Sequence, residues 1–213
     1  KKGYPEPLVI APSSRHTHTI ILLHGRGSNA TRFGLELLKS RTSTGATLQE
    51  LFPGAKFIFP TAKKRRATVF KRVPINQWFD NYSLEDPTQR QDLQYDGLRE
   101  TSAFVHSLIR EEAKAVGLRN VVIGGLSQGC AISLHISLNY EPDQTEPASG
   151  DQPQSLGGYI GMSGWLPFAK DISTAASATK QDTHVEDDIN PFGSAGVSET
   201  EIDDSMEARQ LRA

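Results

Sequence analysis

Four short, uninterrupted apolar runs alternate with segments of helical periodicity along this chain, and this alternation constrains the fold more than any other feature. Continuous apolar character, without an exposed polar face, predicts strands in a sheet that is covered on both sides. The predicted strands are Thr19–Leu23, Lys56–Phe59, Asn120–Ile123 and Leu156–Met162. The sequence therefore predicts an α/β protein with a doubly wound, mainly parallel sheet.

Helical patterns fill the intervals between these runs, and a glycine at position 117 ends the longest of them. The apolar faces of the predicted helices comprise Phe33 and Leu37, then Leu98, Val105, Leu108 and Ile109, and finally Ala131, Ile132, Leu134, His135 and Leu138. After Met162 the chain offers no further convincing strand. A doubly wound sheet is expected to contain more than four strands, so its C-terminal strands are expected to be missing from this chain.

Charge and composition divide the chain into unlike parts. Of the 23 Lys and Arg and the 25 Asp and Glu, residues 171–213 hold three bases and ten acids, which leaves 20 bases and 15 acids before them. This C-terminal segment is rich in Ser, Thr, Ala and Gly, which predicts either disorder or a long surface insertion. We expect an N-terminal extension at residues 1–15, a folded domain at 16–168 and an acidic low-complexity tail or insertion at 169–213.

Length and composition exclude several classes of protein. The longest aliphatic run, Ile20–Leu23, is far shorter than the roughly 18 residues of a membrane helix. The one cysteine, Cys130, excludes an internal disulfide and a multi-cysteine zinc site, which favours a reducing compartment. No signal-peptide core precedes Pro12. We expect a soluble, cytoplasmic protein, and because the chain lacks an initiator methionine we treat it as a possible fragment.

The segment Val121–Cys130 contains a Gly-x-Ser-x-Gly motif centred on Ser127. The motif alone is weak evidence, but here it follows a β-branched strand and precedes a helical pattern, as a nucleophile elbow requires. Such a tight turn strains the serine backbone and exposes its hydroxyl, and side chains at Gly125 and Gly129 would clash where strand and helix approach. The N–H of Gln128 then lies at a helix N-terminus, where it can stabilise an oxyanion.

Phosphate-binding interpretations of the same glycines fail on residue type. A P-loop needs Lys and then Ser or Thr after its last glycine, whereas Cys130 and Ala131 follow Gly129. A dinucleotide-binding fingerprint that begins at Gly125 would need glycine at positions 127 and 130. An ordinary glycine-rich turn is the remaining alternative to the elbow.

A second turn supports the elbow. The strand Thr19–Leu23 leads into His24-Gly25-Arg26-Gly27, a His-Gly-x-Gly turn at the place where hydrolases of this architecture carry the other oxyanion donor. The backbone N–H of Arg26 is the candidate donor. The alternative is a plain glycine turn with the Arg26 side chain in solvent.

Five motifs occur in the order typical of one enzyme family. They are Leu22-Leu23-His24-Gly25-x-Gly27, Phe59-Pro60-Thr61-Ala62, Trp78-Phe79-Asp80, Gly124-Gly125-Leu126-Ser127-Gln128-Gly129 and Ser163-Gly164-Trp165-Leu166-Pro167. The chain resembles the acyl-protein thioesterase and phospholipase/carboxylesterase family of α/β hydrolases, with a fungal-type member as the best likeness. The resemblance covers residues 19–168.

This resemblance implies hydrolysis of esters or thioesters through an acyl-enzyme on Ser127, with no metal and no organic cofactor. The implied substrates are fatty-acyl thioesters on protein cysteines (depalmitoylation) and carboxylic esters, including lysophospholipids. Trp165 and Leu166 would border an acyl-binding groove, although a tryptophan after a strand is equally a normal core residue. Trp78-Phe79-Asp80 is interpreted as structural support.

The family's catalytic triad is incomplete in this chain. The resemblance implies an aspartate in a His-Gly-x-x-Asp stretch and a histidine near the C-terminus, and neither pattern occurs here. His184 lies in the acidic tail and is a poor candidate for the base, and His24 is expected to organise the oxyanion turn. The other histidines, interpreted as structural, are His16, His18, His106 and His135.

A serine hydroxyl needs a general base, so these absences have a functional consequence. We expect the complete gene product to be a serine ester or thioester hydrolase that supplies the Asp and His beyond Ala213, and the 213-residue chain to be inactive. The alternatives are a catalytically inactive, hydrolase-like binding module and a fragment without independent function.

The most basic segment of the chain consists of Lys63 to Arg66 together with Lys71 and Arg72. A solvated loop is one interpretation, and transient contact with an anionic membrane surface is the other. A nucleic-acid partner is not expected, because the cluster is short and belongs to no recognised nucleic-acid-binding module.

Overall fold

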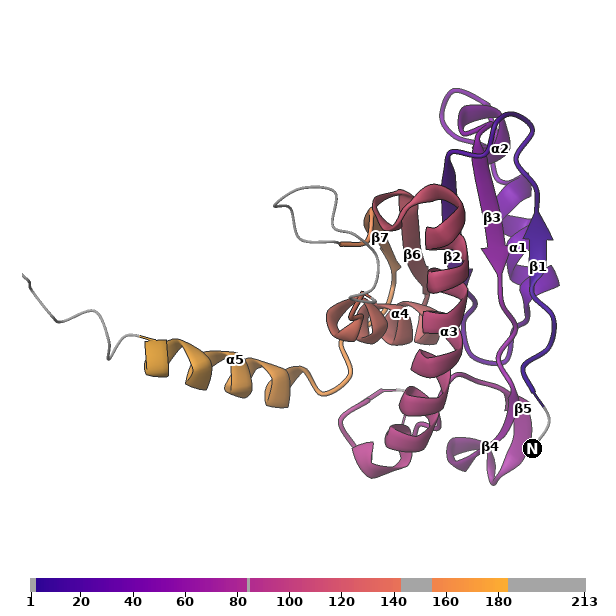
Figure 1. Cartoon of the computed structure of the whole chain (residues 1–213). Coiled ribbons are helices and arrows are strands. Elements are labelled where there is room, and N and C mark those ends of the chain that lie inside the picture. Colours follow the sequence, from indigo (N-terminus) through magenta and orange to yellow (C-terminus); the bar gives the residue numbers. More distant parts are fainter. Residues whose placement is uncertain (1–2, 84, 143–154, 184–213) are drawn as a thin grey trace, which may run out of the picture. The chain divides into compact units, whose positions relative to one another are not determined.

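The computed structural model describes residues 3–83, 85–142 and 155–183. The chain divides into two compact units, Lys1–Ala169 and Lys170–Ala213. The first unit contains a five-stranded sheet with the strand order β1-β3-β2-β6-β7 (Figure 1). Its strands are β1 (Leu8–Ile10), β2 (His18–Leu23), β3 (Ala55–Phe59), β6 (Val121–Leu126) and β7 (Gly158–Met162).

The sheet has the predicted, mainly parallel character. β2 pairs in parallel with β3 and with β6, β6 pairs in parallel with β7, and only β1 is antiparallel. All four predicted strands are confirmed, with ends that differ by up to three residues. The sequence did not predict β1, which lies inside the segment expected to be an N-terminal extension. Leu8 and Ile10 pack against the core cluster that contains Phe57, and this contact holds β1 on the sheet.

Helices cover both faces of the sheet, as the continuous apolar strands predicted (Figure 1). α3 (Tyr95–Val116) and α4 (Gln128–Asn139) pack on one face, against a core that includes Ile21 and Ile123. α1 (Ala30–Lys39) packs on the opposite face, against Phe57 and Phe59. One detail of the predicted helix faces is wrong, because Leu138 is 61% exposed.

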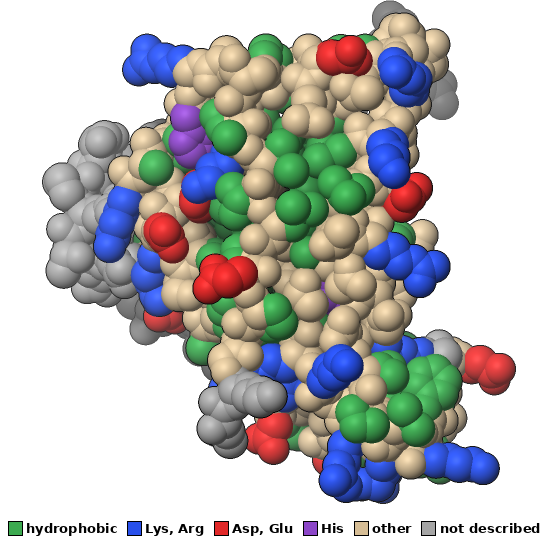
Figure 2. Space-filling view, turned by 90° about the vertical axis from the view of Figure 1, so that its right-hand side faces the viewer, with side chains coloured by type: hydrophobic (Ala, Val, Ile, Leu, Met, Phe, Trp, Pro, Cys, Tyr) green, Lys and Arg blue, Asp and Glu red, His purple; other side chains and the backbone are tan. Residues whose placement is uncertain are grey.

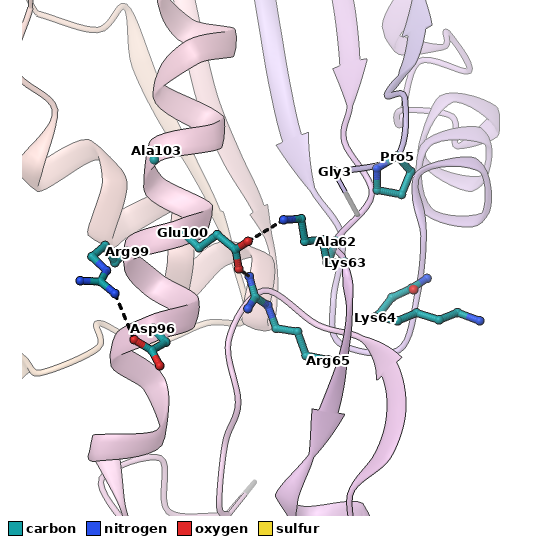
Figure 3. A pocket seen from close by; sticks show the side chains of 11 residues that line it. Gly3, Pro5, Ala62, Lys63, Lys64, Arg65, Asp96, Arg99, Glu100 and Ala103 are labelled. Carbon is teal, nitrogen blue, oxygen red and sulfur yellow. Dashed lines mark hydrogen bonds and ion pairs between the residues drawn. The ribbon is translucent and has the colours of Figure 1, made fainter. Parts of the chain in front are cut away.

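The basic segment forms a two-stranded antiparallel hairpin rather than a solvated loop. Its strands, β4 (Lys64–Ala67) and β5 (Val73–Asn76), flank the short 3-10 helix η1 (Thr68–Phe70). Strand alternation divides the basic side chains between two sides. Lys63 and Arg65 both form 2.5 Å ion pairs with Glu100 of α3 (Figure 3), whereas Lys64 and Arg66 are exposed. The remaining short elements are α2 (Leu48–Leu51), η2 (Gln91–Gln94) and η3 (Leu118–Asn120).

Part of the sheet remains open on the face that α1 covers. A groove of about 740 Å³ is lined there by side chains of β2, β3, β6 and β7, including Leu22, Phe57, Val122 and Ile160. Within residues 155–183, the described part of the chain after position 154, no further strand follows β7. The described elements thus contain the five strands given above and leave the outer edge of β7 unpaired by them.

The described part of the second unit belongs to helix α5 (Ala169–Thr183). The expectation of disorder is therefore wrong for residues 169–183. Alanine has the highest helix propensity, and this segment contains four alanines among its 15 residues, which favours a helix even without an apolar face. The rest of the expected tail, residues 184–213, lies outside the described residues. Across the described helices, none is both long and apolar enough to cross a membrane.

Candidate active site

Ser127 lies at the junction of β6 and α4, in the strained conformation that a nucleophile elbow demands. Its φ and ψ angles are 54° and −116°, values that non-glycine residues rarely adopt. The surrounding glycines leave no room for side chains. A Cβ on Gly125 would lie 2.5 Å from the carbonyl carbon of Gly129, and a Cβ on Gly129 would lie 2.1 Å from the carbonyl oxygen of Leu23. The predicted reason for both glycines is thus confirmed.

The parallel register brings the second turn beside the elbow. Leu23 of β2 is paired with Gly125 of β6, so the turns that follow these two strands meet at the same edge of the sheet. A Cβ on Gly25 would lie only 3.6 Å from the Cβ of Ser127. A cavity of about 630 Å³ opens at this meeting point. Its lining residues are Gly25, Arg26, Gly27, Ser28, Arg32, Phe33, Asn81, Leu126, Ser127, Gln128 and Trp165.

Two backbone donors border this cavity. Gln128 is the first residue of α4, so its N–H has no acceptor within the helix. Among the described residues, no atom accepts a hydrogen bond from the N–H of Gln128 or of Arg26. The neighbouring N–H of Gly27 is already occupied, because it donates to the carbonyl of Asn76 at 2.7 Å. The two donors expected from the sequence therefore lie in one cavity with Ser127.

Buried polar contacts fix the elbow to the segment Trp78-Phe79-Asp80. The side-chain carbonyl of Gln128 accepts a hydrogen bond from the Trp78 N–H at 3.0 Å, and its amide donates to the Phe79 carbonyl at 2.8 Å. The Trp78 indole N–H donates to the carbonyl of His24 at 2.7 Å. Asp80 accepts hydrogen bonds from the backbone and the hydroxyl of Thr68. The segment thus supports both turns, in agreement with its interpretation from the sequence.

His24 is buried beneath the oxyanion turn and both its ring nitrogens are engaged. Nε2 accepts a hydrogen bond from the Ala62 N–H at 3.0 Å, so Nδ1 carries the proton and donates to the Gly25 carbonyl at 2.7 Å. Burial lowers the pKa of His24 and favours this neutral form. Because neither nitrogen is free, His24 positions the turn and does not take a proton from Ser127.

No general base lies in this part of the cavity. The lining residues among those described include no histidine and no carboxylate. His16 and His18 lie at or before the start of β2, at the far end of that strand from Ser127, and His135 bonds to Asn139 on α4. His184 lies outside the described residues. No group of three metal-ligating side chains occurs within the described ranges.

The family model for phospholipases and carboxylesterases matches residues 5–189 of the chain. The chain belongs to this family. Acyl-protein thioesterase 1 of Yarrowia lipolytica is 34% identical to this carboxylesterase-family chain over 182 residues, which cover 84% of the chain and 71% of the relative. Acyl-protein thioesterase 1 of Schizosaccharomyces pombe is 32% identical, and the match covers 80% of the chain and 66% of the relative.

Solved structures agree with this assignment. The crystal structure of Zea mays acyl-protein thioesterase 2 superposes with a TM-score of 0.60 at 28% identity, over 82% of this chain and 68% of that protein. The Arabidopsis thaliana SOBER1 structure gives a TM-score of 0.55 at 27% identity, over 74% and 66% of the two chains. The carboxylesterase-family chain thus has the predicted α/β-hydrolase fold and spans about two thirds of the length of these relatives.

The side chains around Ser127 differ in part from the sequence expectation. Trp165 lines the cavity and packs edge to face on Phe79, with ring centroids 6.1 Å apart. Leu166, its expected companion, is not among the lining residues. The Arg26 side chain is partly buried and lies 5.3 Å from the ring centroid of Phe70, so it does not extend into solvent as the alternative interpretation held. The sequence analysis missed Arg32, which the first turn of α1 brings to the cavity.

Proposed function

We propose that this protein hydrolyses carboxylic esters or thioesters through an acyl-enzyme on Ser127. The observation that carries the proposal is the elbow itself, in which a strained serine shares a cavity with two unpaired backbone N–H donors. This arrangement matches what acyl transfer requires, namely a nucleophile beside preorganised donors for the developing oxyanion.

In the proposed reaction, the Ser127 Oγ attacks the carbonyl carbon as its proton passes to a general base. The carbonyl oxygen becomes an oxyanion, which the N–H groups of Arg26 and Gln128 stabilise. Collapse of the tetrahedral intermediate breaks the ester or thioester bond, and the alcohol or thiol leaves with the proton from the base. Water then attacks the acyl-enzyme, gives up one proton to the base, and releases the carboxylic acid and the free serine.

The base in this scheme comes from outside the described residues that line the cavity. The same observation favours the competing hypothesis, a binding module that keeps the acyl site without catalysis. The two hypotheses differ in one observable intermediate. Acid quenching during thioester turnover, followed by peptide mass spectrometry, should find the acyl group on the peptide that contains Ser127; a module without catalysis would give no acylated serine.

The substrate class follows from the relatives. Two relatives above 30% identity carry the name acyl-protein thioesterase, so we propose fatty-acyl thioesters of proteins as the substrates. Carboxylic esters and lysophospholipids are the second choice, supported by the phospholipase/carboxylesterase family. The cytoplasm is the compartment we propose for this reaction, in keeping with the single, buried cysteine, Cys130.

We further propose that the β4–β5 hairpin brings the protein transiently to membrane surfaces that carry acylated substrates. Apolar side chains at its tip are exposed, with Phe70 at 45% and Val73 at 54%. The exposed bases Lys64, Arg66 and Lys71 surround them on the same hairpin. Figure 2 displays this end of the molecule as a hydrophobic cluster with Lys and Arg side chains around it. Such a combination suits an anionic lipid surface.

Replacing Lys64 and Arg66 together by glutamine is expected to weaken binding to vesicles that contain anionic phosphatidylserine. Each juxtamembrane cation contributes about 1 kcal/mol, so the double variant should bind roughly 30-fold more weakly. Vesicle sedimentation measures this effect. A double variant at two exposed lysines elsewhere, Lys39→Gln with Lys114→Gln, removes the same charge and should bind as before. Equal losses in the two double variants would mean that the hairpin has no special role.

A further inference from the structure

We infer that the cavity beside Ser127 selects esters or thioesters that carry a carboxylate or phosphate close to the cleaved bond, and that the Arg26 guanidinium is the specificity-determining group. This inference rests on the proposed function, because it concerns the same cavity. It narrows the substrates from esters in general to those with an anionic group a few atoms from the reacting carbonyl.

The charge of the cavity is the first observation. Arg26 and Arg32 both line it, and no aspartate or glutamate does so among the described residues. Two like charges in a concave site focus a positive potential on its interior. A neutral acyl ester gains nothing from this potential, whereas a substrate with an anionic oxygen group is drawn to it.

The Arg26 guanidinium also lacks a counter-ion. Among the described residues, no carboxylate lies within 4.0 Å of it. Asp80 acts on it from farther away, and the Asp80 oxygens already accept hydrogen bonds from the backbone and hydroxyl of Thr68 and from Gln77. Burial lowers the pKa of Arg26, but a guanidinium remains charged under all ordinary conditions. An incoming anion would supply the missing counter-charge.

Unsatisfied donors in the cavity wall are the second observation. The Nη1 of Arg26 and the indole Nε1 of Trp165 are both buried without a hydrogen-bond partner among the described residues. Buried donors in native proteins are normally paired, so two orphans in one cavity call for an acceptor. The oxygens of a carboxylate or phosphate can accept from both groups, after the small adjustment that opens them to the cavity. A hydrocarbon chain in the same place would leave both donors unpaired.

A purely structural role for Arg26 makes a different prediction. Its guanidinium lies over the Phe70 ring, and this cation–π contact joins the oxyanion turn to the β4–β5 hairpin. If that contact were the whole role, loss of the guanidinium would lower thermal stability without changing the preference between charged and neutral ligands. The preference itself is therefore the decisive readout.

The experiment measures binding in the Ser127→Ala variant of the chain, so that no chemistry intervenes. The first ligand pair is monomethyl succinate and its neutral isostere methyl levulinate, which differ by the charge on the acyl side. The second pair, 2-acetoxyethyl phosphate and 2-methoxyethyl acetate, places the charge on the alcohol side. NMR titration of the backbone amides of Gly25 and Gly27 gives each dissociation constant and locates binding in the cavity.

For at least one pair, the anion is expected to bind about tenfold more tightly than the neutral ligand, and high salt should reduce this ratio. Arg26→Gln should bring the ratio close to unity and Arg26→Lys should restore most of it. Arg15→Gln, a control at an exposed arginine before β2, should leave the ratio unchanged. A ratio near unity for both pairs in the Ser127→Ala chain, or an equal ratio in Arg26→Gln, would overturn the inference.

Failure of the inference is distinguishable from failure of the proposed function. Absence of an acylated Ser127 alongside a strong anion preference would refute the acyl-enzyme proposal alone. Acylation of Ser127 without any anion preference would refute the inference alone. If Arg26→Gln fails to fold, as circular dichroism would reveal, the salt dependence of the ratio in the Ser127→Ala chain and its value in Arg26→Lys decide the question.

Discussion

Wherever the protein turns over a thioester, Ser127→Ala is expected to lower kcat by a factor on the order of 10⁶. The variant removes the only hydroxyl that the elbow presents, so no acyl-enzyme forms and only the oxyanion donors and substrate binding remain. The fold should persist, because the alanine replaces a side chain for which no hydrogen bond to another described residue is found. Free thiol release, followed with a thiol reagent, measures the rate.

Ser137→Ala is the matched control for this variant. Ser137 lies on the same helix, α4, and its hydroxyl donates to the Leu134 carbonyl at 2.9 Å. Its loss should leave kcat within a few-fold of the unmodified protein. Turnover by Ser127→Ala at a comparable rate would show that another group is the nucleophile.

Gly129→Ala is expected to destabilise the fold by about 3 kcal/mol or more. The added Cβ would lie 2.1 Å from the Leu23 carbonyl oxygen and 2.6 Å from the His24 carbonyl oxygen, so two backbone segments would have to move apart. Rigid backbone cannot rotate away as a flexible side chain can. For a chain of this size the melting temperature should fall by roughly 6–12 °C, and the displaced oxyanion turn should lower activity as well.

Gly158→Ala tests whether this loss comes from the close approach rather than from any glycine replacement. Gly158 begins β7, and a Cβ there would meet only Val122 side-chain carbons at 3.8 and 3.9 Å, which is ordinary contact. Thermal unfolding of Gly158→Ala should therefore stay close to that of the unmodified chain. If both variants melted at the same temperature, steric crowding at the elbow would not explain the glycine in the motif.

The sequence predicted those parts of the molecule whose cause is local. The buried strands follow from continuous apolar runs, and the elbow follows from two glycines around Ser127. The neighbouring oxyanion turn also follows from its own residues, because His24 and Gly25 must fit beneath a backbone that approaches Ser127 closely. Strand pairing then brings both turns together.

The parts that the sequence did not predict depend on distant partners. Strand β4 carries Lys64 and Arg65, a composition typical of a loop, and the Arg65–Glu100 ion pair that fixes its inner side joins residues 35 positions apart. Strand β1 needs Ala55–Phe59 as its partner. The placement of Trp165 in the cavity, without Leu166, likewise depends on contact with Phe79. No local pattern encodes these contacts.

Helix α5 was missed for a different reason. Its serines, threonines and acids are typical of disordered segments, and composition was given more weight than helix propensity. Hydroxyl groups within it bond back to the preceding turn, as in the 2.9 Å hydrogen bond from Thr174 to the Lys170 carbonyl.

Site-resolved labelling by a fluorophosphonate probe tests the central claim, that Ser127 is the nucleophile, most directly. The probe reacts covalently with activated serines, and mass spectrometry locates the bond. Because no described residue of the cavity can take the serine proton, the 213-residue chain should label slowly. The label that does accumulate should be on Ser127, and Ser127→Ala should remain unlabelled. Labelling within minutes would mean that a base is present among the 213 residues, with His184→Ala as the next variant, and labelling at any other residue would contradict the account.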